Sequence, residues 1–351
     1  MGKPVFKVNS TGPEYKASLR SRIIVGLILV AIIVPCLVIG GWAFFAAIAV
    51  FLAVAVFEMI QAPGKKFNWW VYLIAYLTTF GFVYWFVIKG NGAAYLESLK
   101  TGSVFTFSLE DYFSTLDISI IGVACTIGLY CLVAILDKDF GFDDVAYFVT
   151  FSVLLGLGFQ SIYFLRYFPF YLASNTEFSS YPWGGSTYGE VAKTGNFAYL
   201  SSTELILFAM IGGIFNDTFA YFGGIYFGKH PLNKRISPHK TIEGFLIGWG
   251  VATVALLTIG FSLAGAGYPI TAFLDLGHWY YILLLAIFIP LFGVLGDLSF
   301  SMIKRHFGIK DFGNVLRGHG GVLDRIDSLV FVSVATAIFC VFIMNGWNFF
   351  L

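Results

Sequence analysis

The chain has 351 residues, of which 58% are hydrophobic and only 12% are charged. Because soluble globular proteins carry about 25% charged residues, this composition excludes an ordinary soluble domain and indicates an integral membrane protein. The formal net charge of +1 identifies no class of partner, and the four cysteines form neither a CxxC nor a Cys/His metal-binding pattern.

Nine apolar stretches are each about as long as a membrane-spanning helix, which needs about 20 apolar residues. They lie at residues 23–40, 42–62, 69–88, 117–136, 147–172, 199–215, 244–266, 279–298 and 327–349. We therefore predict an all-α polytopic membrane protein with about nine transmembrane helices. Its predicted parts are a cytoplasmic N-terminal tail, transmembrane helices with long outer loops, and a C-terminal catalytic transmembrane domain, at residues 1–22, 23–198 and 199–351.

The basic residues predict the orientation of these spans. With a cytoplasmic N-terminus, 17 of the 21 Lys and Arg residues fall in cytoplasmic segments. The exceptions are Lys89, Lys100, Arg166 and Lys193. Because cytoplasmic loops of membrane proteins carry an excess of Lys and Arg, we predict that the N-terminus lies inside and the C-terminus outside.

The segment at residues 215–244 is predicted to be a cytoplasmic connection with polar residues at both ends. Asn216 and Asp217 end an apolar run, and an Asp buried there would need a partner or a metal. Before the seventh span, Ser237, Lys240 and Thr241 suit a phosphate at a helix N-terminus. A Ser cap followed by Glu243 in the first turns explains the same residues equally well.

A second charged segment surrounds the start of the last span. Asp297 ends the eighth span, and a continuing helix would place Ser301, Lys304 and Arg305 on its face. In the Gly318–Gly321 turn, three glycines surround His319, so backbone N–H groups could approach an anion closely. The last span then begins with two carboxylates three residues apart, Asp324 and Asp327.

The two segments together combine carboxylates, cations and a glycine-rich turn on one predicted membrane face. Carboxylate oxygens bind Mg²⁺, and Lys and Arg neutralise phosphate oxygens, so this combination favours phosphoryl or nucleotidyl transfer. A transporter with a charged cytoplasmic gate and an anionic-lipid anchoring patch are the alternatives. Glu58 and Glu204 are the only acidic residues near span interiors, and both lie close to span ends, which weakens the transporter alternative.

Residues 301–327 resemble the C-terminal motif of the phosphatidate cytidylyltransferases, also called CDP-diacylglycerol synthases. The matching residues are Ser301, Lys304, Arg305, Lys310, Asp311, Gly313, Leu316, His319, Gly320, Gly321, Asp324, Arg325 and Asp327. Arg317 departs from the pattern, because the family usually has Pro there. Upstream, "NDTFAYFGGIYFGKHPL" and "SPHKTIEG" resemble the preceding motifs, with His239 where a second Lys is common. The resemblance is strong over residues 210–330.

The resemblance implies a reaction in which CTP and phosphatidic acid give CDP-diacylglycerol and pyrophosphate with Mg²⁺ as cofactor. It implies Asp297 and Asp324 as the metal carboxylates. The implied catalytic residues are Lys304, Arg305, Lys310, Asp311, His319, Arg325 and Asp327. The implied substrate-binding residues are Asn216, Asp217, Ser237, Lys240, Thr241, Glu243, Ser301, Gly320 and Gly321.

The expected partners are the two substrates and the lipid bilayer, with no nucleic acid; a homodimer is left open. The expected location is a bacterial inner membrane, with the active site facing the cytoplasm. A CDP-alcohol phosphotransferase is disfavoured because its Asp-Gly-x-x-Ala-Arg pattern is absent. A CTP-dependent lipid or polyprenol kinase stays open, because such enzymes can share fragments of the motif.

Overall fold

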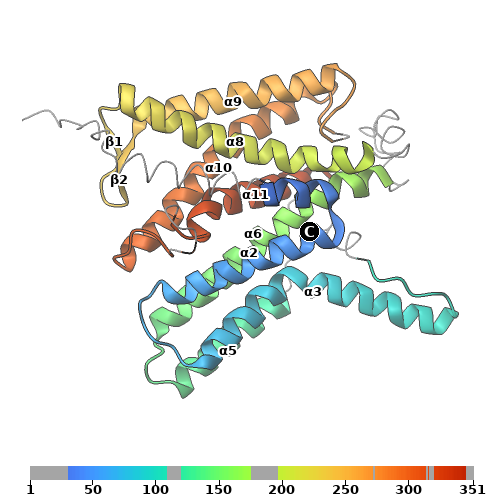
Figure 1. The fold of residues 1–351 in the computed structure, drawn as a ribbon, viewed down its shortest axis with the longest axis vertical. Coiled ribbons are helices and arrows are strands. Elements are labelled where there is room, and N and C mark those ends of the chain that lie inside the picture. Colours follow the sequence, from blue (N-terminus) through green and yellow to red (C-terminus); the bar gives the residue numbers. More distant parts are fainter. Residues whose placement is uncertain are drawn as a thin grey trace, which may run out of the picture.

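The computed structural model describes residues 31–108, 120–174, 197–271, 273–313, 315 and 320–344. Residues 31–39 are helical. The helices that follow are α2 (Gly41–Gln61), α3 (Trp69–Thr101), α5 (Ile120–Leu136), α6 (Phe142–Ser174), α8 (Phe197–Phe227), α9 (Ile242–Gly265), α10 (Trp279–His306) and α11 (Leu323–Met344). Two strands, β1 (Pro231–Asn233) and β2 (Ser237–Thr241), form an antiparallel hairpin between α8 and α9 (Figure 1).

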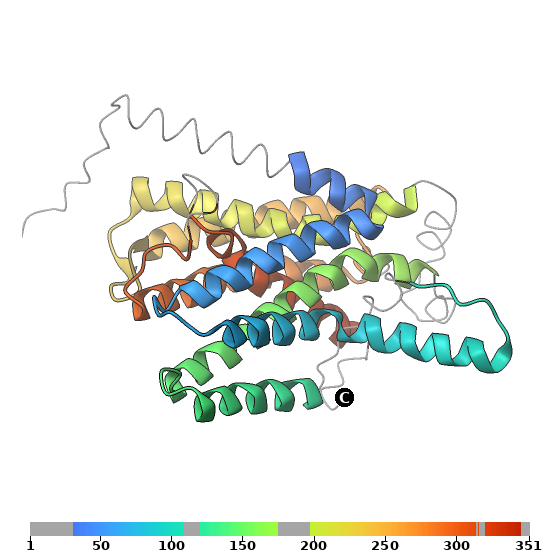
Figure 2. The ribbon, with the colours of Figure 1, turned by 60° about the horizontal axis from the view of Figure 1, so that its bottom comes forward.

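The helices confirm the predicted class of fold, an all-α polytopic membrane protein. Among the described residues, seven helices are long and apolar enough to cross a membrane, and α5 is a shorter apolar helix of 17 residues. Every predicted span overlaps a helix, although the start of the first span and the long outer loop at 175–196 lie outside the described residues. α3 has 33 residues and is about 50 Å long, so it projects past its neighbours (Figure 2).

α6 lies in the centre of the bundle and packs against α3, α5, α8 and α11 (Figure 1). Its one cation, Arg166, is 1% exposed and donates from Nε to the Leu37 carbonyl at 2.8 Å. That carbonyl lies near the end of the helical residues 31–39, where Gly40 breaks the helix with a φ of 67°. A side chain at Gly40 would also collide with the Arg166 guanidinium. The buried Arg166 side chain from α6 therefore stabilises the helix break at Gly40, just before α2.

The predicted end of the sixth span is wrong, because α8 continues past residue 215 to Phe227. Asn216 is fully buried, so this polar position faces the protein instead of ending the helix. α9 packs closely along this part of α8, since Gly244 and Gly248 leave no room for a Cβ beside the α8 backbone. Small residues allow such close helix pairs in membranes. The purely helical prediction also missed the β1–β2 hairpin, whose turn is closed by Asn233 Oδ1 accepting from the N–H groups of Arg235 and Ile236.

Candidate active site

The charged residues that the motifs contain meet where four elements come together. Figure 1 shows the hairpin β1–β2 at the same end of the molecule as the C-terminal end of α10. Lys240 on β2 pairs with Asp297 on α10, and Lys304 on α10 pairs with Asp324 on α11. Asp217 on α8 lies close enough to Lys240 to favour its charged form. The two motif segments therefore form one composite cluster.

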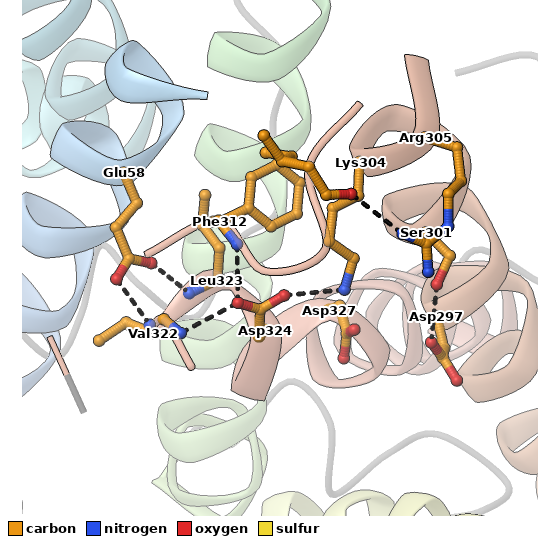
Figure 3. Close-up of polar contacts among 12 residues, drawn as sticks. Glu58, Asp297, Ser301, Lys304, Arg305, Phe312, Val322, Leu323, Asp324 and Asp327 are labelled. Carbon is orange, nitrogen blue, oxygen red and sulfur yellow. Dashed lines mark hydrogen bonds and ion pairs between the residues drawn. The ribbon is translucent and has the colours of Figure 1, made fainter. Parts of the chain in front are cut away.

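Lys304 and Asp324 form a buried ion pair at the centre of the cluster (Figure 3). Lys304 Nζ lies 2.8 Å from Asp324 Oδ1, and their side chains are only 10% and 4% exposed. The other oxygen, Asp324 Oδ2, accepts from the backbone N–H groups of Phe312 and Gly321, both at 2.9 Å. A buried pair persists only where its remaining hydrogen-bonding capacity is satisfied, and here both carboxylate oxygens have partners.

An aromatic cluster fixes the loop that follows α10. Phe312 is buried, and its ring centroid lies 5.9 Å from those of Phe151 on α6 and Phe300 on α10. Lys304 Nζ lies over the Phe312 ring, 5.6 Å from its centroid. The loop therefore presents the Phe312 N–H to Asp324 from a packed position.

Asp297 is the more accessible carboxylate of the cluster. Its side chain is 21% exposed, and it pairs with Lys240, which is 34% exposed. Ser301 Oγ, one turn later on α10, donates to Asp297 Oδ1 at 3.4 Å. Burial lowers the pKa of Lys240, although the neighbouring Asp217 and Asp327 favour its charged form. The predicted face of α10 is confirmed, but Asp297 takes its lysine from the hairpin and not from α10.

Asp217, Asp327 and Asn216 line the side of the cluster toward α8. Asp327 is buried and accepts from the Ser328 N–H at 2.7 Å. Asn216 Nδ2 donates to Asp217 Oδ1 at 3.2 Å. The amide oxygen Asn216 Oδ1 is buried, and the structure gives it no hydrogen-bond partner. This side of the cluster is therefore rich in oxygen acceptors beside Lys240.

The donor set suits a divalent cation that keeps water and substrate ligands. Among the described residues, no three His, Cys, Asp or Glu side chains come together as a ready-made metal cage. Mg²⁺ does not require one, because it is usually bound by one or two carboxylates together with substrate phosphates and waters. Asp297 and Asp324 each attract a cation already, and the orphaned Asn216 oxygen adds an uncharged acceptor. The residues present therefore fit Mg²⁺ bound through few protein ligands.

The structure places several predicted site residues at the edge of this cluster. Lys310, Asp311 and Arg325 are exposed, and Asp311 lies beside Gly320, which has a φ of 83°. Arg305 is exposed and donates from Nη1 to the Ile309 carbonyl at 3.0 Å. His319 and Arg317, the residue that differs from the family pattern, lie outside the described residues.

Thr241 and Glu243 form hydrogen bonds at the junction between the hairpin and α9, and neither contacts Asp297 in the described interactions. Thr241 Oγ1 accepts from the Gly244 N–H at 3.1 Å, so it is the N-cap of α9. The Glu243 carboxylate lies 2.6 Å from His230 Nδ1 and accepts from the N–H groups of Lys229 and His230. Ser237 begins β2, paired with Asn233. The predicted Ser cap is therefore wrong, because Thr241 caps α9 and Ser237 lies in β2, whereas Glu243 does lie in the first turn of α9.

Sequence reasoning missed Glu58 as part of this site. Glu58 lies on α2, is fully buried, and accepts hydrogen bonds from the backbone N–H groups of Val322 and Leu323 at 3.0 and 2.8 Å (Figure 3). The available signal was an acidic residue inside an apolar span, which is costly without a function or a partner. The sequence predicted no partner for it.

Comparisons with known proteins identify the family of the chain. The model of the cytidylyltransferase family matches residues 20–343. The chain is 30% identical over 314 residues to the phosphatidate cytidylyltransferase of Bacillus subtilis (strain 168), covering 90% of this chain and 94% of that protein. Shorter matches, 41% identical over 145 residues and 43% over 127, are to phosphatidate cytidylyltransferases of Staphylococcus saprophyticus and Staphylococcus haemolyticus. These cover 39% and 36% of this chain, and 50% and 45% of those proteins. Since the family model spans nearly the whole chain, the protein belongs to the cytidylyltransferase family.

Proposed function

We propose that the protein converts CTP and phosphatidic acid to CDP-diacylglycerol and pyrophosphate. The observation that carries the proposal is the pair of lysine–carboxylate contacts, Lys240–Asp297 and Lys304–Asp324, gathered from separate elements of a cytidylyltransferase-family chain. Two lysines beside two carboxylates provide for both parts of a metal–triphosphate complex. The cations can neutralise phosphate oxygens, and the carboxylates can hold a divalent ion.

Asp297 and Asp324 are the carboxylates proposed to hold Mg²⁺. Asp297 is the accessible one, and Asp324 offers Oδ1, because its Oδ2 is committed to two backbone N–H groups. When bound, Mg²⁺ would neutralise charge on the triphosphate and polarise its phosphorus centres. On release from these carboxylates, Lys240 and Lys304 can turn their ammonium groups to the phosphates of CTP and of the leaving pyrophosphate.

The reaction requires little proton transfer from the protein. An oxygen of the phosphatidic acid phosphate attacks the α-phosphorus of CTP, a new phosphorus–oxygen bond forms, and the bond to the β-phosphate oxygen breaks. Because the attacking phosphate is already an anion at neutral pH, no strong general base is needed. The task of the protein is to bind, orient and stabilise charge, which is the main source of catalysis in such transfers.

The lipid substrate is proposed to approach along α8. The stretch of α8 around Asp217 also carries exposed aromatic residues, among them Phe215, Phe219 and Tyr221. Acyl chains can pack on this apolar surface while the headgroup reaches Lys240. We propose a bacterial cell membrane as the location, because the relatives come from bacteria, with the site facing the cytoplasm that supplies CTP.

The test is to incubate purified protein with labelled CTP, phosphatidic acid and Mg²⁺ and to identify the products. Formation of CDP-diacylglycerol and pyrophosphate supports the proposal. Folded protein that forms no CDP-diacylglycerol refutes it. A phosphorylated lipid alcohol together with CDP also refutes it, in favour of a CTP-dependent lipid kinase.

A further inference from the structure

Glu58 connects the N-terminal half of the molecule to the loop that carries the motif. It comes from α2, its side chain is fully buried, and each of its oxygens accepts one backbone N–H. The donors, Val322 and Leu323, are at the very start of α11. The first N–H groups of a helix have no partner inside the helix, and a carboxylate is favoured there by the helix dipole. Glu58 therefore acts as an N-terminal cap supplied from a distant helix.

The loop is built to admit this carboxylate. Gly313 and Gly321 lie at either end of the loop segment that holds the glycine-rich turn, and a Cβ at either would collide with the Glu58 carboxylate. The carboxylate thus fills the space between two stretches of backbone that any larger residue would close. Glycine at both positions is explained by the close approach of Glu58.

Two carboxylates divide the backbone N–H groups at the start of α11 between them. Asp324 Oδ2 accepts from Gly321, and Glu58 accepts from the next two residues, Val322 and Leu323 (Figure 3). Asp324 Oδ1 meanwhile holds Lys304. The first turn of α11 is therefore fixed to α2 through Glu58 and to α10 through Lys304, and the Asp324 carboxylate is directed by both.

We propose that Glu58 is a positioning residue of the active site: it fixes the first turn of α11 and so aligns the Asp324 carboxylate with Lys304. Glu58 has both oxygens committed to backbone and acts on the reaction only through Asp324. The inference rests on the proposed function, in which Asp324 and Lys304 handle the metal and the triphosphate. If the hydrogen bonds to Glu58 contributed only to stability, their loss would leave turnover per folded molecule unchanged.

The decisive variant is Glu58→Gln. Gln keeps the size of the side chain, but its amide nitrogen must face one of the two backbone N–H groups as a second donor. We expect kcat to fall roughly 10- to 100-fold and the half-saturating Mg²⁺ concentration to rise, as for other groups that orient a metal ligand. The KM for phosphatidic acid should stay unchanged. Glu204→Gln, at another glutamate inside an apolar helix, is the matched control and should leave all three parameters unchanged.

A readout independent of turnover is amide hydrogen exchange at Val322 and Leu323. Both amides should exchange faster in Glu58→Gln than in the wild type, while amides in the centre of α9 keep their protection. Gly313→Ala is the second variant, in case Glu58→Gln does not fold. It retains Glu58 but pushes its carboxylate aside, so it should reproduce the loss in kcat and the faster exchange.

The outcomes separate the inference from the proposed function. Wild-type protein that forms no CDP-diacylglycerol refutes the proposed function. It also refutes the positioning role, whatever the exchange experiment shows about the hydrogen bonds from Val322 and Leu323 to Glu58. If the wild type is active, a folded Glu58→Gln or Gly313→Ala variant with wild-type kcat and Mg²⁺ dependence overturns the positioning role alone. Unchanged exchange at Val322 and Leu323 in Glu58→Gln would also overturn it.

Discussion

Replacing Lys304 with Ala removes one partner of the buried pair and leaves Asp324 charged at a site where its side chain is 4% exposed. Breaking a buried pair in this way costs about 3–5 kcal/mol of unfolding free energy. We expect about 3 kcal/mol, the lower end, because Asp324 Oδ2 keeps its two backbone hydrogen bonds. Lys240→Ala is the comparison: its pair with Asp297 is 34% and 21% exposed, so the loss should be about 1 kcal/mol or less.

The two losses can be measured by unfolding the detergent-solubilised protein with SDS and following the fluorescence of its eight tryptophans. A loss in Lys304→Ala no larger than that in Lys240→Ala would refute the reasoning from burial. The double variant Lys304→Ala, Asp324→Asn supplies a second check. Its neutral amide needs no cation, so it should regain part of the stability while staying inactive.

Three further predictions concern other parts of the molecule. Asp297→Asn should lower kcat by about 10²–10³-fold with little change in stability, because it removes charge that acts on the bound metal and triphosphate. Arg166→Met should lower the unfolding free energy by about 1.5–3 kcal/mol, since the Leu37 carbonyl loses its buried charged donor, and should leave the KM for CTP unchanged. Asn68→Ala should lower the melting temperature at pH 7, and the difference from the wild type should close in acid. The hydrogen bond from Asn68 lowers the pKa of Asp137, so its stabilising effect is present above the unfolded pKa of about 3.9 and is lost as the pH falls through the folded value.

Each of these predictions has a result that contradicts it. Asp143→Asn, at an exposed carboxylate on α6, is the control for Asp297→Asn, and equal turnover in the two variants would remove Asp297 from the metal role. Arg166→Met with wild-type stability would show that the break at Gly40 does not depend on the guanidinium. A stability difference in Asn68→Ala that is the same at all pH values would exclude Asp137 as its cause.

The helices and the family could both be predicted from the sequence, because each depends on local features of the chain. Hydropathy is a local property, so each apolar stretch identified a helix, and the motif at 301–327 identified the family that the comparisons confirm. The end of α8 was mistaken because Asn216 looks like a boundary when its neighbours in space are unknown. Polarity marks a helix end only where the residue meets water, and Asn216 is buried against α9.

The partners within the site could not be predicted in the same way. Lys304 was placed correctly on the face of α10 that bears Asp297, but its partner is Asp324, and Asp297 pairs with Lys240 from the hairpin. Glu58 binds amides more than 260 residues away, and no local pattern encodes that contact. Composition can show that charges gather near one membrane face, whereas the pairing among them depends on how the helices pack.

The bond between Glu58 and Val322 also has a consequence for how the protein is made. Glu58 enters the membrane 264 residues before the ribosome reaches the amide that it binds. Throughout that interval α2 carries an acid without the N–H donors that it binds in the folded protein, so its last turn is expected to stay near the headgroups or to take up a proton. The acid meets these donors only when α11 arrives, so the contact between α2 and the start of α11 is expected to be one of the last to form as the protein is made.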